Sequence, residues 1–224
     1  YSAISAGDSH TCALEAATGH AACWGSNSVG QATPPSPAVA YSAIAAGNYH
    51  MCALEAATGH AACWGRNDDG QATPPSPAVA YSAISAGDSH TCALEAATGH
   101  AACWGDNEFR KATPPSPAVA YSAISAGDSH TCALEAATGH AACWGRNDDG
   151  QATPPSPAVA YSAISAGNDY TCALEAATGH AACWGDNEFR KATPPSPAVA
   201  YSAIAAGNYH MCALEAATGH AACW

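Results

Sequence analysis

A 40-residue repeat constrains the fold of this chain more than any other feature of its sequence. Copies begin at Tyr1 and at every fortieth residue after it, and the sixth copy is partial. Such a period is typical of solenoids and propellers, in which each repeat packs only on its neighbours. We therefore expect a single repeat array over residues 1–224, with units 1–40, 41–80, 81–120, 121–160, 161–200 and a partial unit 201–224.

Within each copy, short apolar segments alternate with glycine-containing turns. In the first copy, Gly7 and Gly19 lie between the segments YSAISA, HTCAL and AACW, and Gly25 follows the last of them. Segments of this length bounded by glycine predict strands, and no helical periodicity is present. We therefore expect an all-β chain of tandem 40-residue β-repeats. The tryptophan of each copy is interpreted as a packing anchor between neighbouring units.

Two cysteines recur in every copy and predict a disulfide across a hairpin. If residues 16–19 form a four-residue loop, Cys12 faces Cys23 in a non-hydrogen-bonded pair, with Cα atoms about 4.5 Å apart. Closing so short a loop stabilises a unit by roughly 2–3 kcal/mol. The expected pairs are Cys12–Cys23, Cys52–Cys63, Cys92–Cys103, Cys132–Cys143, Cys172–Cys183 and Cys212–Cys223.

Metal binding is the alternative use of these cysteines. His10, Cys12 and Cys23, with His20, would supply four ligands in the first copy. The Cys-x-x-Cys spacing of zinc sites is missing, and Tyr170 replaces the histidine in the fifth copy. We therefore expect disulfides and no metal. Paired cysteines persist in oxidising compartments, which predicts an extracellular chain, either secreted or at the cell surface.

Charge and hydropathy exclude several partners. The net charge is −12, with 6 Lys and Arg against 18 Asp and Glu, so no basic patch is available for nucleic acid. No apolar run approaches the roughly 20 residues that span a bilayer. The chain begins and ends within the repeated phrase, which predicts a processed chain or part of a longer array.

Catalysis is not expected from this sequence. An active site needs a unique convergence of nucleophile, base and electrostatic stabiliser, whereas nearly every polar residue here recurs in five or six copies. No phosphate-binding glycine loop or Ser-His-Asp set stands out. We expect no catalytic residues and no cofactor.

The order of the repeated residues resembles a known family. In the first copy, the glycines, histidine and leucine of AGDSHTCAL precede the phrase WGSNSVGQ, and the order resembles the regulator of chromosome condensation repeat. The resemblance implies one propeller blade per repeat, in a closed β-propeller or an open β-superhelix. Members of the family with paired cysteines are typically extracellular. The phrase DNEFRK at 106–111 and 186–191 departs from the family pattern.

The loop after the tryptophan alternates between copies. Arg66 and Arg146 occupy the position that Asp106 and Asp186 hold in neighbouring copies. Opposite charges on successive units are expected to attract, with a small gain for each exposed pair.

The ATPPSPAVA linker is the remaining distinctive segment. Its prolines favour an extended polyproline II conformation on the outside of the molecule. The linker resembles the hydroxyproline-rich glycoproteins of plant and green-algal walls, and the alternative is an unmodified stiff spacer. The candidate O-glycosylation and hydroxylation sites are Pro34, Pro35, Ser36, Pro37, Pro74, Pro75, Ser76, Pro77, Pro114, Pro115, Ser116, Pro117, Pro154, Pro155, Ser156, Pro157, Pro194, Pro195, Ser196 and Pro197.

These features together predict an extracellular structural or adhesive repeat scaffold, such as a glycosylated filament or a cell-surface component. The expected partners are neighbouring copies of the chain or a longer array, together with glycans. The alternative is a multivalent β-propeller module that binds proteins or glycans in the manner of an inhibitor or a lectin.

Overall fold

The computed structural model describes all residues from 1 to 224, and they fall into two compact units, Tyr1–Asn107 and Glu108–Trp224. Unit 1 contains β1 (Ala3–Ala6), β2 (His10–Leu14), β3 (Ala21–Gly25), β4 (Tyr41–Ala46), β5 (His50–Glu55), β6 (Ala61–Gly65), β7 (Tyr81–Ala86), β8 (His90–Glu95) and β9 (Ala101–Gly105). Unit 2 contains β10 (Tyr121–Ala126), β11 (His130–Glu135), β12 (Ala141–Gly145), β13 (Tyr161–Ala166), β14 (Tyr170–Glu175), β15 (Ala181–Gly185), β16 (Tyr201–Ala206), β17 (Met211–Glu215) and β18 (Ala221–Cys223). Two 3₁₀ turns, η1 (Glu108–Arg110) and η2 (Glu188–Arg190), also lie in unit 2.

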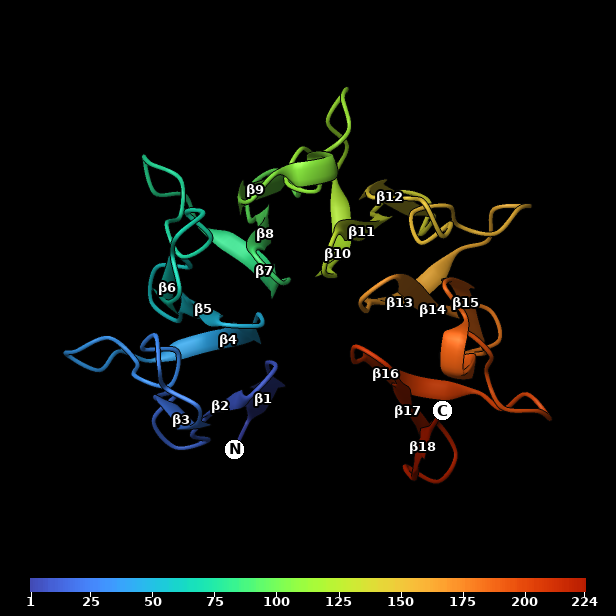
Figure 1. Cartoon of the computed structure of the whole chain (residues 1–224), viewed down its shortest axis with the longest axis horizontal. Helices are drawn as coiled ribbons and strands as arrows, with labels where there is room; N and C mark the ends of the chain where they lie inside the picture. Colours follow the sequence, from blue (N-terminus) through green and yellow to red (C-terminus); the bar gives the residue numbers. More distant parts are fainter. The chain divides into compact units, whose positions relative to one another are not determined.

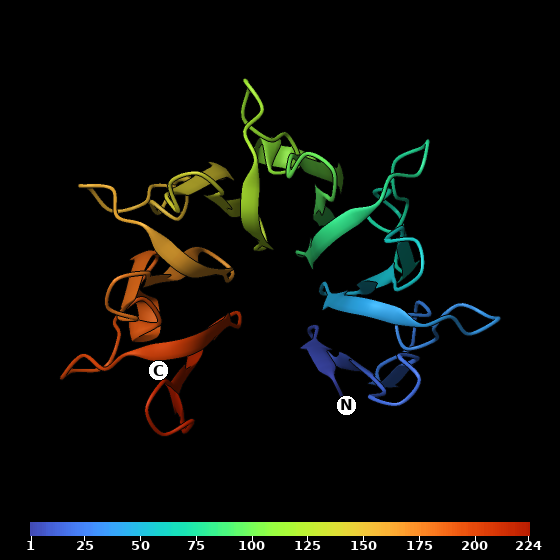
Figure 2. The same cartoon turned by 180° about the vertical axis from the view of Figure 1, so that it is seen from behind.

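Each repeat folds into its own antiparallel sheet of three consecutive strands, such as β1-β2-β3 or β13-β14-β15. No strand of one sheet pairs with a strand of another, and none of the sheets closes into a barrel. Neighbouring sheets are joined by side-chain hydrogen bonds instead, such as that from Ala46 N to Ser5 Oγ over 2.9 Å. Figures 1 and 2 show the three sheets of each unit from opposite sides. The predicted all-β repeat architecture is confirmed.

The second hairpin of each sheet has the register that the sequence indicates. In the first repeat, Leu14 pairs with Ala21, and Cys12 pairs with Cys23. The backbone N–H of Gly19 donates to the carbonyl of Glu15 over 2.8 Å and closes the loop. Gly19 has a φ of 70°, which explains why glycine ends this loop in every copy.

The core of each unit lies between neighbouring sheets. In unit 1, Cys12 and Leu14 of the first sheet pack on Tyr41, Met51 and Trp64 of the second. The same faces meet at the other sheet–sheet contacts inside each unit. Leucine and methionine side chains and the tyrosine and tryptophan rings are the large apolar groups buried at these contacts, among smaller alanine and cysteine side chains.

Each buried tryptophan also binds the preceding repeat. Trp64 is 8% exposed, and its Nε1–H donates to the carbonyl of Gln31 over 3.0 Å. The next residue, Gly65, has a φ of 95°, and a Cβ there would lie 3.1 Å from the Cα of Gln31. Trp104, Trp144 and Trp184 donate to the equivalent carbonyls inside their own units. The interpretation of the tryptophans as packing anchors is therefore confirmed for these four copies. Trp24 is 46% exposed, and Nε1 of Trp224 has no hydrogen-bond partner.

The proline-rich linkers form arms that project from the sheets (Figure 1). Ser36 and Pro37 are exposed and form a bend, and the peptide bond between them is cis. The other four linkers have the same cis bond. The arms are therefore on the outside, as expected, but a bend interrupts the extended conformation that the prolines suggested.

Candidate functional site

The structure joins the two cysteines of every repeat by a disulfide. The Cα atoms of each pair are 4.1 Å apart, and no cysteine is free. Cys12 is fully buried on the face that packs against the next sheet. His20 lies instead in the hairpin loop, and no group of three or more His, Cys, Asp or Glu side chains is placed to hold a metal ion.

The histidine at the start of the second strand contacts the next repeat. His50 Nε2 lies 2.8 Å from Thr91 Oγ1, and that hydroxyl donates to the carbonyl of Gln71 over 2.9 Å. Since the threonine proton is committed to the carbonyl, His50 Nε2 carries the proton, and its buried Nδ1 has no partner. Burial, with His10 adding to it, lowers the pKa of His50 to about 4. His130 and Thr171 repeat this arrangement in unit 2, and burial lowers the pKa of His130 to about 4.

In the second and sixth repeats, Met51 and Met211 replace the threonine that binds the histidine of the preceding repeat, so the hydrogen bond between histidine and threonine cannot form. Tyr170 packs on Met211, and its hydroxyl donates to the carbonyls of Gly207 and His210. His10 belongs to the sheet that packs on Met51, and neither of its ring nitrogens has a hydrogen-bond partner. These side chains are buried where neighbouring sheets pack, and their role is structural.

The variable residues gather at one edge of the sheets, which we call the loop edge. It consists of the turn after the first strand (residues 47–49 in the second repeat) and the loop after the third strand (residues 66–71). The two segments are joined by a backbone hydrogen bond, from Arg66 N to Tyr49 O over 2.9 Å. In the loop, Gln71 Oε1 accepts from Asp69 N over 2.9 Å, and Asn67 Oδ1 accepts from Ala72 N over 2.9 Å. All six Lys and Arg residues of the chain belong to these loops: Arg66, Arg110, Lys111, Arg146, Arg190 and Lys191.

The DNEFRK loop, residues 186–191 in the fifth repeat, has a different conformation from the loop that ends in Gly-Gln. Phe189 and Arg190 both have a φ of 63°, in the left-handed region. Arg190 occupies the position of Gly30 in the first repeat, which has a φ of 83°. Lys191 takes the glutamine position and is 3% exposed. Its Nζ lies 2.6 Å from Asp186 Oδ2, and this contact lowers the pKa of Asp186.

Arginine side chains cover aromatic rings at the loop edge. The guanidinium of Arg66 lies 6.0 Å from the ring centre of Tyr49, and its Nε is 2.8 Å from Asp68 Oδ2. Asp68 belongs to the same loop as Arg66. The expected attraction between successive units is present at Arg146, whose Nη1 lies 3.4 Å from Asp169 Oδ1 of the following repeat. Its partner there is not Asp186, which pairs with Lys191 of its own loop.

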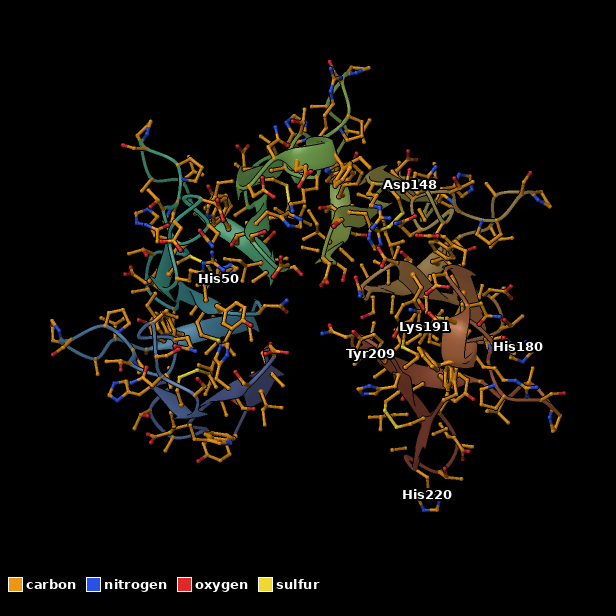
Figure 3. All side chains as sticks on the ribbon, viewed as in Figure 1. His50, Asp148, His180, Lys191, Tyr209 and His220 are labelled. Carbon is orange, nitrogen blue, oxygen red and sulfur yellow. A yellow bond between two sulfur atoms is a disulfide. The ribbon has the colours of Figure 1, made fainter.

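Unit 2 carries the most exposed aromatic residues of the loop edge. The rings of Phe189 and Tyr209 meet edge to face, with centroids 6.3 Å apart, and Lys191 Nζ lies 5.9 Å from the ring centre of Tyr209. Figure 3 labels Lys191 and Tyr209, which lie together near one end of β16, whereas His220 lies at the hairpin tip far from them. This aromatic contact was not predicted, because it joins two different repeats.

The opposite edge, which we call the hairpin edge, is the same in all repeats. It consists of the loops between the second and third strands, residues 15–20 in the first repeat. Glu15 Oε2 accepts from Thr18 Oγ1 over 2.7 Å, and Thr18 Oγ1 accepts from His20 N over 3.1 Å. Each proline arm also ends at this edge, where Tyr41 N donates to Gly19 O over 2.9 Å. The two edges therefore differ, one variable and one constant.

Tandem three-stranded antiparallel sheets that pack face to face, with tryptophans that bond to the preceding repeat in four of them, define a β-propeller-type repeat protein. The family model for the regulator of chromosome condensation (RCC1) repeat matches residues 1–31, 41–71, 81–110 and 121–151. The matched segments cover more than half of the chain, and the chain belongs to this family. No curated protein matches the sequence.

Solved structures of plant receptor ectodomains share this fold. The chain is 29% identical to the entire ectodomain of the receptor kinase CR4 from Physcomitrella patens, with a TM-score of 0.82 over 99% of this chain and 60% of that one. It is 27% identical to the CRINKLY WD40 ectodomain of the receptor kinase ACR4 from Arabidopsis thaliana, with a TM-score of 0.80 over 99% of this chain and 78% of that one. Prp20p from Saccharomyces cerevisiae is 18% identical, with a TM-score of 0.83 over 99% of this chain and 71% of that one, and shows the fold alone.

The disulfides and the relatives of this chain also indicate where it resides. Six disulfides and similarity to two ectodomains indicate an extracellular environment. No helix of the structure has the length and apolar character needed to span a bilayer.

Proposed function

We propose that this chain is an extracellular repeat scaffold that binds proteins through its loop edge. One observation carries the proposal: the sheet faces and the hairpin edge are nearly constant between repeats, whereas the loop edge changes from copy to copy. A constant core supplies a rigid support, and variable loops on such a support are typical of binding surfaces. The scaffold would be secreted or held at the cell surface.

The proposal excludes catalysis and cofactor binding as the main role. The buried histidines are committed to contacts between sheets, as His50 is to Thr91, and the glutamates of the hairpin edge bond to neighbouring threonines. A mechanism would need these groups to converge in one pocket, and the repeat distributes them evenly instead.

Site-specific photo-crosslinking tests the proposed function. A benzoylphenylalanine in place of Tyr209 samples the loop edge, and one in place of Ala177 samples the exposed hairpin edge of the same unit. The full chain is irradiated on the surface of the cells that produce it, and crosslinked proteins are detected by mass spectrometry. We expect protein crosslinks at position 209 and few at position 177; their absence from position 209 would refute the proposal.

A structural filament is a second candidate, because two apolar sheet faces are exposed. Leu214 is 43% exposed, whereas Leu174 at the same position of the preceding sheet is 2% exposed. On β1–β3, Tyr1 is 73% and Trp24 46% exposed. Since these faces correspond to two that pack together elsewhere in the chain, head-to-tail contact between copies would bury both. Light scattering tests this: Leu214→Glu should dissociate any assembly, and a native chain that stays monomeric at high concentration would exclude it.

The proline arms would carry O-linked sugars or hydroxyproline in this setting. Pro35, Ser36 and Pro37 are exposed, and the arm projects away from the sheet that precedes it. Intact mass before and after chemical deglycosylation tests this proposal on the native protein. A native mass equal to that of the oxidised sequence would leave the arms as unmodified spacers.

A further inference from the structure

Two segments of this chain are each present twice. Residues 201–224 have the same sequence as residues 41–64, and residues 1–25 have the same sequence as residues 81–105. Inside unit 1, the sheet β4-β5-β6, built from the first of these sequences, packs on the sheet β7-β8-β9, built from the second. The sheets β16-β17-β18 and β1-β2-β3 therefore carry the side chains of two surfaces that fit each other inside unit 1.

The apolar part of the internal contact is a leucine beside two aromatic rings. Leu54, Tyr81 and Trp104 belong to one buried cluster and are 1%, 5% and 8% exposed. On the first sheet, the counterparts of the two rings, Tyr1 and Trp24, are exposed to solvent. Large rings of this kind mark a surface that gains from being covered by a complementary one.

The last sheet has the matching recess. Ala203, Cys212, Leu214 and Ala221 line an apolar hollow of about 200 Å³, together with neighbouring alanine and isoleucine side chains. The counterparts of these four residues all pack in the cluster that holds the two rings, and they are Ala43, Cys52, Leu54 and Ala61. The hollow thus lies where the rings of a following sheet pack inside unit 1.

Two hydrogen bonds fix the register of the internal contact. Asn48 Nδ2 donates to Asp88 Oδ1 over 2.7 Å, and His50 Nε2 lies 2.8 Å from Thr91 Oγ1. The exposed faces carry the same residue types, Asn208 and His210 on the last sheet and Asp8 and Thr11 on the first. Polar groups that match in identity and position favour one register of a contact over its neighbours.

We propose that the last sheet, β16-β17-β18, docks on the first sheet, β1-β2-β3, of a second copy of this chain. His210 bonds to Thr11 and Asn208 to Asp8 across the contact, and the apolar groups of the two faces cover each other. Because both faces are exposed in the folded chain, the occupant comes from another molecule. This inference rests on the filament proposed above as a second candidate, and names the residues that select its partner.

The contact between copies should be weaker than the internal one. Inside unit 1, Thr91 Oγ1 and Trp104 Nε1 both donate to the carbonyl of Gln71. Gln71 lies outside the duplicated segments, so these two bonds have no counterpart among the duplicated residues. Association is therefore expected to depend on protein concentration.

The repeats themselves supply variants that fit the strands. Thr11→Met introduces the residue of the second and sixth repeats. His210 would then face methionine, as His10 does in the first repeat, where neither ring nitrogen has a partner. Adding His210→Tyr recreates the pair formed by Tyr170 and Met211, in which the tyrosine hydroxyl donates to backbone carbonyls.

Sedimentation velocity over a range of concentrations measures the self-association of the full chain and its variants. We expect the native chain to form head-to-tail oligomers, and Thr11→Met to weaken their association about tenfold, since a histidine is left unpaired. Thr11→Met with His210→Tyr should restore the association to within about threefold of the native value. His220→Gln, in the hairpin loop of the last sheet, is the control and should associate as the native chain does.

Photo-crosslinking identifies the two faces that meet. Benzoylphenylalanine replaces Trp24, or Ala17 in the hairpin loop as the control, in a mixture of isotopically light and heavy chains. After digestion with trypsin, crosslinks from position 24 should join fragment 1–66 to fragment 192–224, with one light and one heavy partner. Position 17 should give few crosslinks.

The outcomes separate this inference from the proposals on which it rests. A native chain that stays monomeric would overturn the inference and the filament together, and would leave the loop-edge proposal to its own test at position 209. Assembly that Thr11→Met does not weaken, that His210→Tyr does not restore, or that crosslinks position 24 to another fragment would keep the filament and reject this pairing. Crosslinks only between fragments of equal isotope label would show closure within one chain, and would reject a second copy as the occupant.

Discussion

His50 Nε2 donates a hydrogen bond to Thr91 Oγ1, a residue 41 positions further along the chain, with 2.8 Å between the two atoms. The hydroxyl of Thr91 donates a hydrogen bond to the carbonyl of Gln71, so the contact joins β5, β8 and the loop between β6 and β7. Both side chains are fully buried. The neutral form of the histidine is therefore part of the packing between repeats.

The free energy of unfolding should fall as the pH drops from 6.5 to about 4. An unfolded histidine binds a proton below pH 6.5, whereas the folded pKa values of His50 and His130 are about 4. The unfolded state binds more protons across this window, so acid favours it, by about 3 kcal/mol for each histidine at the lower end. Urea denaturation at a series of pH values measures the loss.

Variants at the two histidines separate this effect from carboxylate titration. His50→Gln with His130→Gln should flatten the dependence between pH 6.5 and 5, because these side chains no longer titrate. His60→Gln with His140→Gln, in the hairpin loops, is the control and should leave the slope as it is. An unchanged slope in the first variant would contradict the assignment.

Replacing His10 by tyrosine should stabilise the first repeat. His10 buries two ring nitrogens without partners, and its sheet packs on Met51. In the fifth repeat, which packs on Met211, Tyr170 instead donates to the carbonyls of Gly207 and His210. His10→Tyr would find the equivalent carbonyls of the second repeat, and satisfying a buried polar group is worth roughly 1–3 kcal/mol.

The same replacement at His50 is the matched control. His50→Tyr takes the hydrogen bond away from Thr91 and adds volume where no methionine accommodates a ring, so it should destabilise the chain. The free energies of unfolding of both variants are measured at neutral pH. If both replacements changed the free energy of unfolding equally, the choice between methionine and threonine in the next repeat would not determine whether histidine or tyrosine is more stable at this position.

The sequence specifies what happens within a repeat better than what happens between repeats. The pairing of Cys12 with Cys23 follows from a short loop and the two-residue period of strands, both of which are local. The contact of His50 with Thr91 depends on how one sheet rests on the next, and strand alternation does not determine that offset. For the same reason the partners of Arg146 were not predicted, since one of them, Asp169, lies in the turn of the following repeat.

All disulfides should remain within their own repeats in the folded protein. Trypsin cuts after the loop-edge Lys and Arg residues, so fragment 1–66 holds two cysteine pairs, and fragments 67–110, 112–146, 147–190 and 192–224 hold one pair each. Without reduction, all five fragments should separate freely. Each fragment with one pair should be lighter by two hydrogen atoms than after reduction, and fragment 1–66 should be lighter by four. Fragments joined by a disulfide, or free thiols, would contradict the pairing.

Removing one pair should destabilise the chain without unfolding it. Cys172→Ala with Cys183→Ala opens a short loop, which costs about 2–3 kcal/mol in the chain-entropy model. The neighbouring repeats keep their own disulfides and sheet contacts. Urea denaturation measures the difference in the free energy of unfolding between the variant and the native chain. If both have the same urea midpoint, packing alone stabilises the hairpin.

Asp186 and Lys191 should be energetically coupled, because the amine of Lys191 is nearly inaccessible and lies 2.6 Å from the carboxylate. Asp186→Ser leaves a buried ammonium with only aromatic rings near it, at 5.5 Å from the ring centre of Tyr170, and should cost roughly 1–3 kcal/mol. Lys191→Gln should cost less, because Asp186 is more exposed and keeps its bond from Glu188 N.

The double variant tests the coupling directly. Asp186→Ser with Lys191→Gln reproduces the residues of the first repeat, where Gln31 Nε2 lies 3.4 Å from Ser26 Oγ and Gln31 Oε1 accepts from Val29 N. The double variant should therefore be more stable than the sum of the single changes predicts, by about 1 kcal/mol or more. Free energies of unfolding for the native chain and the three variants complete the cycle. Additive losses would show that the buried ammonium is stabilised by Tyr170 and Tyr209 rather than by Asp186.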